Sequence, residues 1–188
     1  MLLQIVFFLI DTLASFFAGL MLLRFLMQLR RLSFAHPLGQ FVVKLTNWAV
    51  LPLRRVIPGV GGYDWASLLP AWVLLAGVQG LQLGLVLGGD VLRWLPAAAL
   101  FGVLELIHLT VVVFIALVLV QAILSWVNPY APLARPVAEL TEPILAPLRR
   151  IIPTISGIDL SPLVALLAGQ VVLMLLSGVR ASLLPALL

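Results

Sequence analysis

The chain has 188 residues, of which 63% are hydrophobic and only 10% charged, and its net charge is +4. A soluble domain of this length carries about a quarter charged residues, so this composition excludes an ordinary soluble domain and predicts an integral membrane protein. The sequence has no cysteine and only two histidines, which excludes disulfides, thiolate metal sites and cysteine nucleophiles, and we expect neither a metal site nor a cofactor.

Four apolar segments are long enough to cross a membrane, which takes about 20 residues. In chain order they cover about Leu2–Leu23, Ala66–Leu87, Ala97–Ile123 and Leu160–Ser177. The first segment lacks a basic region at its start and is interrupted by Asp11, so we interpret it as a retained transmembrane helix and not as a signal peptide. A short turn with glycine and proline, residues 88–96, separates the second segment from the third.

The sequence repeats itself after 95 residues. Between Pro37 and Leu68, 14 of 32 positions are identical to the positions 95 residues later, without a gap. We interpret this as a duplication, with a first repeat over residues 1–93 and a second over 94–188, each holding two transmembrane helices and a connector. Because each unit has an even number of crossings, the copies should point the same way. The predicted fold class is an all-α integral membrane protein with four transmembrane helices, arranged as two tandem parallel two-helix repeats.

Each connector begins with a short amphipathic segment. Apolar residues recur there at helical spacing, which predicts helices lying in the membrane interface better than it predicts solvated loops. In the first connector the apolar face holds Leu38, Phe41, Val42, Leu45, Trp48 and Ala49, and in the second it holds Leu133, Val137, Leu140 and Ile144.

The connectors continue into the motif P-L-R-R-(V/I)-I-P. Pro52 and Pro147 are expected to begin a short helical stub, which Pro58 and Pro153 should end, since proline disfavours a helical conformation in the residue before it. The arginines of the stubs would then lie at the level of lipid phosphates, where each gains about 1 kcal/mol from anionic lipid.

Two arginines in each motif are followed by G-x-D. A glycine, Gly62 or Gly157, permits a tight turn, and the aspartate after it is expected to cap the next helix, although Ser161-Pro162 offers a competing start in the second copy. Structural anchoring is one interpretation of these residues. The other is a lipid- or partner-binding site, in which the arginines pair with the aspartates or bind a head group or a partner's acidic group. The candidate residues are Arg54, Arg55, Asp64, Arg149, Arg150 and Asp159.

Basic residues are concentrated in the two connectors, which hold eight of the eleven lysines and arginines. The positive-inside rule therefore predicts that both connectors are cytoplasmic and both termini outside. We interpret the positive charge as this orientation signal together with contacts to anionic lipid head groups, and expect no nucleic-acid binding.

Three ionisable residues lie inside the predicted membrane helices: Asp11, Glu105 and His108. A carboxylate facing lipid costs roughly 2.5–3.5 kcal/mol, so we expect these side chains to face other helices. They either form a proton or cation path, which would need an oligomer to be complete, or make interhelical hydrogen bonds. A tandem G-x-x-x-G ridge predicts close helix packing, within the chain or between chains: Gly80, Gly84 and Gly88.

Four hydrophobic segments in two units, each with PLRR-(V/I)-IP…G-x-D, together with ILSWVNPYAP (Ile123–Pro132), resemble the bacterial YggT family and its YlmG relatives. The resemblance covers essentially the whole chain. It implies a multi-pass protein of the bacterial inner membrane. In different lineages the family is associated with osmotic-stress tolerance and potassium homeostasis, with septum or nucleoid organisation, and with haem attachment to a photosynthetic cytochrome. This sequence departs from the pattern at Trp48, where the second copy has Pro143, and at Tyr63-Asp64-Trp65.

Three classes of function are compatible with these features. The first is a non-enzymatic scaffold or assembly factor that engages lipids and a membrane-protein partner or a second copy. The alternative is an ion transport or channel component, for potassium or protons, that uses Asp11 and Glu105. An intramembrane enzyme comes third, because the chain has no G-x-S-x-G, H-E-x-x-H or P-loop motif and Ser125 has no evident base.

Overall fold

The computed structural model of the chain describes residues 1–57, 59, 61–88, 91–152 and 159–187. These residues form six α-helices and one short 3₁₀ helix: α1 (Leu2–Leu29), α2 (Pro37–Val56), α3 (Trp65–Leu87), η1 (Val91–Trp94), α4 (Leu95–Val127), α5 (Ala134–Ile151) and α6 (Ser161–Leu187). Five residues for which the sequence predicts turns or helix ends lie outside the described residues: Pro58, Gly89, Asp90, Pro153 and Gly157.

Helices α1, α3, α4 and α6 are long and apolar enough to cross a membrane, which confirms the four predicted spanning segments. Two of them are longer than predicted, since α1 continues to Leu29 and α6 to Leu187. Arg180 therefore lies within α6, and the expectation that this segment ends near Ser177 is wrong. The helix continues through this charge because neighbouring helices supply polar partners for the guanidinium group.

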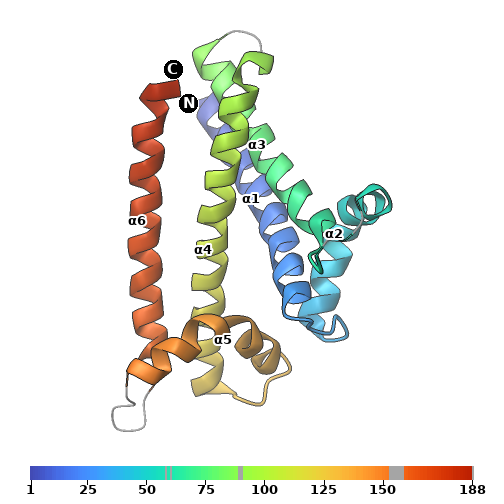
Figure 1. Cartoon of the computed structure of the whole chain (residues 1–188), viewed down its shortest axis with the longest axis vertical. Coiled ribbons are helices and arrows are strands. Elements are labelled where there is room, and N and C mark those ends of the chain that lie inside the picture. The colour runs from blue at the N-terminus through green and yellow to red at the C-terminus, as the bar shows by residue number, and fades with distance from the viewer. Residues whose placement is uncertain (58, 60, 89–90, 153–158, 188) are drawn as a thin grey trace.

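Both termini lie at one end of the molecule and α5 lies at the other, while α2 lies beside α1 and α3 between the two ends (Figure 1). Helix α4 is central, because it packs against α3 on one side and α6 on the other. Helix α1 packs mainly against α3, whereas α6 packs against α4 and α5. Whether the two halves are parallel repeats, and whether α2 and α5 lie on a membrane surface, stay predictions.

Each of the two connector helices is held by a fully buried residue at its centre. Val50 of α2 packs among residues of α1 and α3, including Met21 and Leu75. Leu145 of α5, which lies 95 residues after Val50, packs in the same way against Val118 of α4 and Ala165 of α6. Both connector helices are thus wedged against the two membrane helices that they join.

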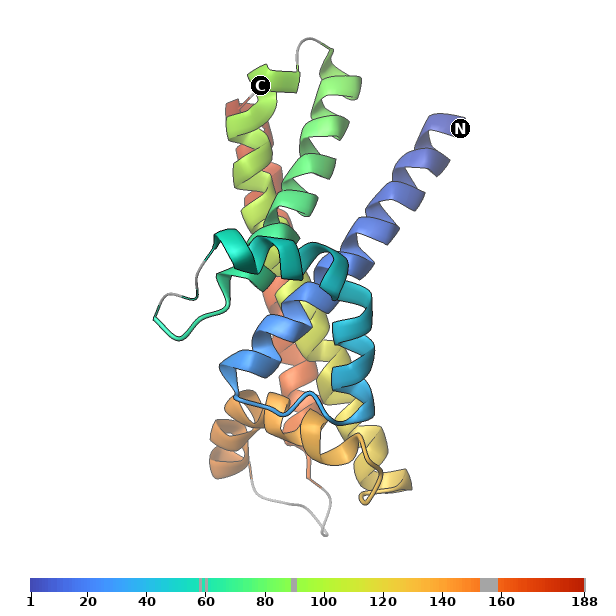
Figure 2. The same ribbon diagram turned by 90° about the vertical axis from the view of Figure 1, so that its right-hand side faces the viewer.

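Proline does not divide the connectors as predicted. Pro52 lies inside α2, and Pro143 and Pro147 lie inside α5, so the expectation of separate stubs beginning at Pro52 and Pro147 is wrong. A proline removes one backbone hydrogen bond and bends a helix, but it need not end it. Figure 2 shows the bend in α2, whose later part runs across the direction of its earlier part.

The apolar face of α2 is divided between the protein interior and its surroundings. Val42 and Val50 are fully buried, and so is Thr46, which lies between them at helical spacing. Phe41 and Trp48 belong to the predicted apolar face, yet Trp48 is 64% exposed and Phe41 is also exposed. The predicted apolar face is therefore only partly buried within the protein.

Helices α3 and α4 approach each other closely. A side chain at Gly80 would meet Cβ of Ala98 at 3.2 Å, and one at Gly102 would meet Cβ of Ala76 at 2.6 Å. Gly88 ends α3 with a φ of 73°, a conformation that favours glycine. Of the two alternatives for the glycine ridge, Gly80 supports packing within the chain.

Candidate functional site

Arg54 and Asp64 join the end of α2 to the start of α3. The Nη2 atom of Arg54 lies 2.7 Å from Oδ2 of Asp64, and the hydroxyl of Ser67 donates to the same carboxylate oxygen. Between them the chain turns through Gly61 and Gly62, which have φ values of 68° and 81°. Residues with a Cβ rarely adopt this conformation, so these glycines allow the turn that brings Asp64 back to Arg54.

Arg149 and Asp159 make the corresponding connection from α5 to α6. The Nε atom of Arg149 lies 2.8 Å from Oδ2 of Asp159, and its Nη1 atom lies 3.2 Å from Oε2 of Glu142. The backbone N–H and the hydroxyl of Ser161 both donate to Oδ1 of Asp159. Partial burial by itself raises the pKa of the Asp159 carboxyl. The hydrogen bonds from Ser161 and Arg149 and the charge of Arg149 outweigh this effect, so the pKa lies below its usual value.

The two aspartates differ in how they meet the next helix. Asp64 occupies the cap position of α3. Its carboxylate accepts no backbone N–H of that helix, so the prediction that the side chain of Asp64 caps α3 is wrong. The carboxylate instead binds the side chains of Arg54 and Ser67. Asp159 does accept the N–H of Ser161, the first residue of α6. At the start of α6 the aspartate thus accepts a backbone N–H, and the hydroxyl of Ser161 donates to the same carboxylate.

The second arginine of each motif remains at the surface. Arg55 and Arg150 are both exposed, and neither forms an ion pair with another residue that the structure describes. The structure therefore separates the arginines into two kinds. Arg54 and Arg149 are paired with the aspartates, and Arg55 and Arg150 face outward.

Sequence reasoning missed the role of Arg24. This residue lies in the second half of α1 and is only 4% exposed. Its Nη1 atom donates to Oγ1 of Thr46 at 2.8 Å and to Oδ1 of Asn47 at 3.0 Å, both on α2. A charged residue within an otherwise apolar helix was a visible signal, but its partners were not, because they lie 22 and 23 residues away.

A hydroxyl at the same point of the second half makes a related contact. Thr141, which is 95 residues after Thr46, is fully buried in α5. Its hydroxyl donates to the side-chain carbonyl of Gln121 on α4. In both halves a buried threonine thus links the connector helix to the membrane helix that precedes it.

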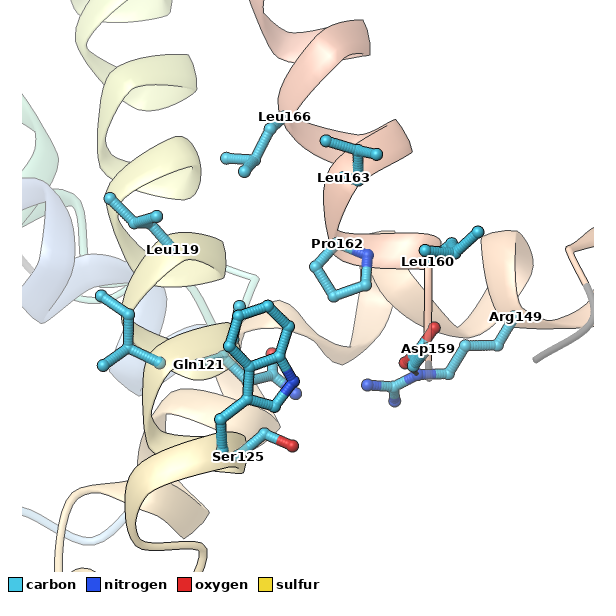
Figure 3. Close-up of a pocket in the computed structure, with 12 residues that line it drawn as sticks. Leu119, Gln121, Ser125, Arg149, Asp159, Leu160, Pro162, Leu163 and Leu166 are labelled. Carbon is cyan, nitrogen blue, oxygen red and sulfur yellow. Dashed lines mark hydrogen bonds and ion pairs between the residues drawn. The ribbon is translucent and has the colours of Figure 1, made fainter. Parts of the chain in front are cut away.

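A cavity of about 370 Å³ lies between α4 and α6, beside the Arg149–Asp159 pair. Figure 3 shows Leu119, Leu163 and Leu166 around one part of this cavity. In the same view, Arg149 and Asp159 face each other at its edge, and Gln121 and Ser125 come from α4. The cavity is therefore apolar with a polar end.

The intramembrane polar residues form a cluster that omits Asp11. Nη1 of Arg180 lies 2.8 Å from Oε2 of Glu105, and Nη2 of Arg180 lies 2.8 Å from Oε1 of Gln79. Nδ1 of His108 lies 3.5 Å from the other oxygen of Glu105. Within the part of the chain that the structure describes, no hydrogen bond or ion pair joins Asp11 to Glu105 or His108. The structure thus brings Glu105 and His108 together, and sequence reasoning missed Arg180 as the cation between α4 and α6.

The geometry of this cluster suits a clamp between helices. An ion pair with further hydrogen bonds lowers the cost of placing charges in a membrane, and here it ties α6 to α3 and α4. Among the described residues, no group of three or more histidine, aspartate or glutamate side chains is placed to hold a metal ion.

A family model described as CCB3/YggT matches residues 3–86 and 100–180. An uncharacterised protein of Pseudomonas aeruginosa is 37% identical over 170 residues, covering 89% of this chain and 86% of that protein. A protein of Vibrio alginolyticus, named for its position in the proC 3′ region, is 38% identical over 164 residues, covering 87% of this chain and 88% of its own. The Escherichia coli protein named uncharacterized protein YggT is 36% identical over 166 residues, covering 88% of this chain and 85% of that protein. No solved structure matches the chain.

Proposed function

The chain belongs to the CCB3/YggT family, and from this premise we propose that it is a non-enzymatic scaffold or assembly factor of the bacterial inner membrane, acting in osmotic-stress or envelope homeostasis. In this proposal its two halves are parallel repeats with cytoplasmic connectors and external termini. The connectors are the surfaces that bind lipids and the partner. Each presents one outward-facing arginine, Arg55 or Arg150, to anionic lipid head groups and to the acidic group of a membrane-protein partner.

The observation that carries this proposal is that the two arginines of each R-R pair have different environments. One forms an ion pair with an aspartate, and the other is exposed. Ion pairs exposed to solvent contribute only about 0–1 kcal/mol, so the Arg54–Asp64 and Arg149–Asp159 pairs matter for position more than for stability. Each pair holds the end of a connector helix against the start of the next membrane helix. The neighbouring arginine is then held at a fixed place, where its planar guanidinium group suits a phosphate or a carboxylate.

Charge-neutral variants test the proposal in cells. A strain lacking its own family member is complemented with the wild-type chain or with the double variant Arg55→Gln/Arg150→Gln, and growth is measured after an osmotic upshift. We expect the double variant to be present in the membrane at the wild-type level but to fail to restore growth. Lys44→Gln, which removes an exposed charge of α2 outside the motif, is the matched control and should restore growth. Full complementation by the double variant would contradict the proposal.

One observation favours a second candidate function, ion transport. Glu105, His108 and Gln79 form a polar cluster inside a helix bundle, as transport sites often do. Arg180 already neutralises Glu105, however, which favours the clamp. Purified protein in liposomes decides between them by potassium and proton flux. Transport predicts flux that Glu105→Gln abolishes and Arg55→Gln/Arg150→Gln leaves unchanged, whereas the scaffold predicts no flux above empty liposomes.

A further inference from the structure

The two halves surround their Arg–Asp pairs with different neighbours. In the first half the buried guanidinium group of Arg24 is near enough to Arg54 and Asp64 for both charges to act on it. The residue 95 positions later is Leu119, which is apolar. Leu119 lines the cavity of about 370 Å³ between α4 and α6, together with Arg149 and Asp159. The second half thus has a cavity at the point where the first half has the side chain of Arg24.

The second half has polar side chains at the positions of both acceptors of Arg24. Arg24 donates to Thr46 and Asn47, whose counterparts 95 residues later are Thr141 and Glu142. Glutamate is a stronger acceptor for a cation than asparagine, because its hydrogen bonds are assisted by charge. The Oε2 atom of Glu142 lies 3.2 Å from Nη1 of Arg149, whereas Asp159 contacts the Nε atom of the same guanidinium group.

The local charge therefore differs between the two halves. Arg24, Arg54, Arg55 and Asp64 together carry two net positive charges, whereas Arg149, Arg150, Asp159 and Glu142 together carry no net charge. Asp159 also retains acceptor capacity. A carboxylate has about four acceptor positions, and the described contacts of Asp159 use three, from the N–H and hydroxyl of Ser161 and from Arg149. A cation that entered the cavity would find this free acceptor without the excess positive charge of the first half.

The rest of the cavity defines what such a cation must be attached to. The wall is made of Leu119, Leu163 and Leu166, with Gln121 and Ser125 near the polar end (Figure 3). Its volume lies within the range of roughly 300–1,000 Å³ for small-molecule sites. Arg150 is exposed next to Arg149 and is available for an anion. The site thus offers an acidic group, a basic group and an apolar wall in one place, which matches an amphiphile carrying charges of both signs.

We propose that the cavity between α4 and α6 binds one phospholipid whose head group carries a primary ammonium. The ammonium lies against the free acceptor position of Asp159, the phosphate lies toward Arg150, and one acyl chain follows Leu119, Leu163 and Leu166. This inference rests on the proposed function, because it places the Arg149–Asp159 pair at the level of lipid head groups. A primary ammonium donates hydrogen bonds to a carboxylate, whereas a quaternary ammonium has no N–H group and a glycerol head group has no positive charge.

Lipid binding to the purified full-length chain tests this site. The chain is titrated in detergent with ethanolamine, choline and glycerol phospholipids that share the same acyl chains, and the lipid retained per chain is measured by native mass spectrometry. We expect ethanolamine lipid to be retained about tenfold more strongly than choline lipid, as the loss of a charge-assisted hydrogen bond implies.

The decisive variant is Leu119→Arg, which restores the side chain that the first half has at this point. Its guanidinium group should occupy the place of the ammonium, so that ethanolamine-lipid binding falls about tenfold or more. Leu119→Met, which is apolar and of similar volume, is the matched control and should bind as the wild type does. If Leu119→Arg aggregates, Leu166→Trp fills the apolar part of the cavity and should also abolish binding.

Three results would overturn the inference. They are equal retention of the three lipids, retention of glycerol lipid that survives both blocking variants, or a second copy of the chain that Leu119→Arg displaces. None of these results determines whether the double variant Arg55→Gln/Arg150→Gln restores growth, so this inference can fail while the proposed function stands. Conversely, ethanolamine-selective binding together with full complementation by that double variant would leave the site in place and remove the scaffold proposal.

Discussion

At the scale of single residues, Arg24 has the most demanding environment described in the molecule. A buried charge is costly unless hydrogen bonds compensate it, and Arg24 finds this compensation in two side chains of α2. Thr46, one of these partners, is itself fully buried and also donates to the backbone carbonyl of Val42. The contact therefore fixes the position of α2 against α1 by polar bonds as well as by packing.

Replacing Thr46 with valine should destabilise the protein by about 1–3 kcal/mol, because the guanidinium group of Arg24 would lose a buried acceptor while the volume stays the same. The measurement is the midpoint of thermal unfolding in detergent. Thr12→Val is the control. Thr12 is exposed and its hydroxyl bonds only to the backbone of its own helix, so its loss should have little effect. An equal loss of stability in both variants would contradict this role for Thr46.

A second prediction for a single residue concerns Asp159 and the pH dependence of folding stability. Because the pKa of its carboxyl is lower in the folded chain than in the unfolded chain, the carboxylate contributes stability above its usual pKa of about 4. That contribution is lost as the pH falls through the folded-state pKa. Thermal midpoints of the wild type and of Asp159→Asn should therefore differ by a constant amount above about pH 5 and converge in more acidic buffer. A difference that grows on acidification would contradict this assignment.

At the scale of elements, the contact between α3 and α4 depends on small residues that let two backbones approach. Gly102 of α4 lies so close to α3 that an added Cβ would stand 2.8 Å from Cα of Ala76. Contacts of this kind drive helix association in membranes, where burial of apolar surface contributes little. Since α4 is central, this contact also determines how the first three helices meet the last two.

Gly102→Ala should therefore force α3 and α4 apart and destabilise the protein by about 1–3 kcal/mol, as overpacking does. Gly77→Ala is the matched control on α3, since no atom lies within 4 Å of its added Cβ. This control should be neutral or slightly stabilising, because alanine favours helix over glycine by about 1 kcal/mol. Thermal unfolding in detergent measures both variants. A neutral Gly102→Ala would show that the two helices can separate without cost.

At the scale of the whole molecule, the four membrane helices place the two loops before α2 and α5 at the end opposite to the termini (Figure 1). The halves are packed unequally. Helix α3 lies between α1 and α4, whereas α6 has its main contacts only with α4 and α5. The cavity beside Arg149 and Asp159 is a consequence of this looser second half.

The orientation that we propose predicts a specific labelling pattern. The chain has no cysteine, so single cysteines can be placed at exposed loop positions without removing any charge, at Ser33 and Asn128. A membrane-impermeant thiol reagent should label both from the cytoplasmic side only. Ser182→Cys, near the end of α6, should be labelled from the outside only. Labelling of positions 33 and 128 from opposite sides would exclude parallel repeats.

Apolar length and motif spacing alone predict the membrane class, the four spanning helices and the residues of both R-R/G-x-D motifs. Apolar length and local periodicity carry this information within one segment, so no tertiary contact is needed to read it. The pairing of Arg54 with Asp64 was one alternative among several, and a spacing of ten residues across a turn could not choose between them.

Which polar groups meet across helices is known only from the packing of the helices. Arg24 finds Thr46, and Arg180 finds Glu105 and Gln79, over separations of up to 101 residues. The sequence shows that each of these side chains needs a partner, because a membrane offers none. It does not show which face of each helix turns toward which neighbour, since nearly uniform hydrophobicity leaves the rotation of a membrane helix unmarked. Close packing of small residues and the few available polar bonds set that rotation, and they exist only once the helices are assembled.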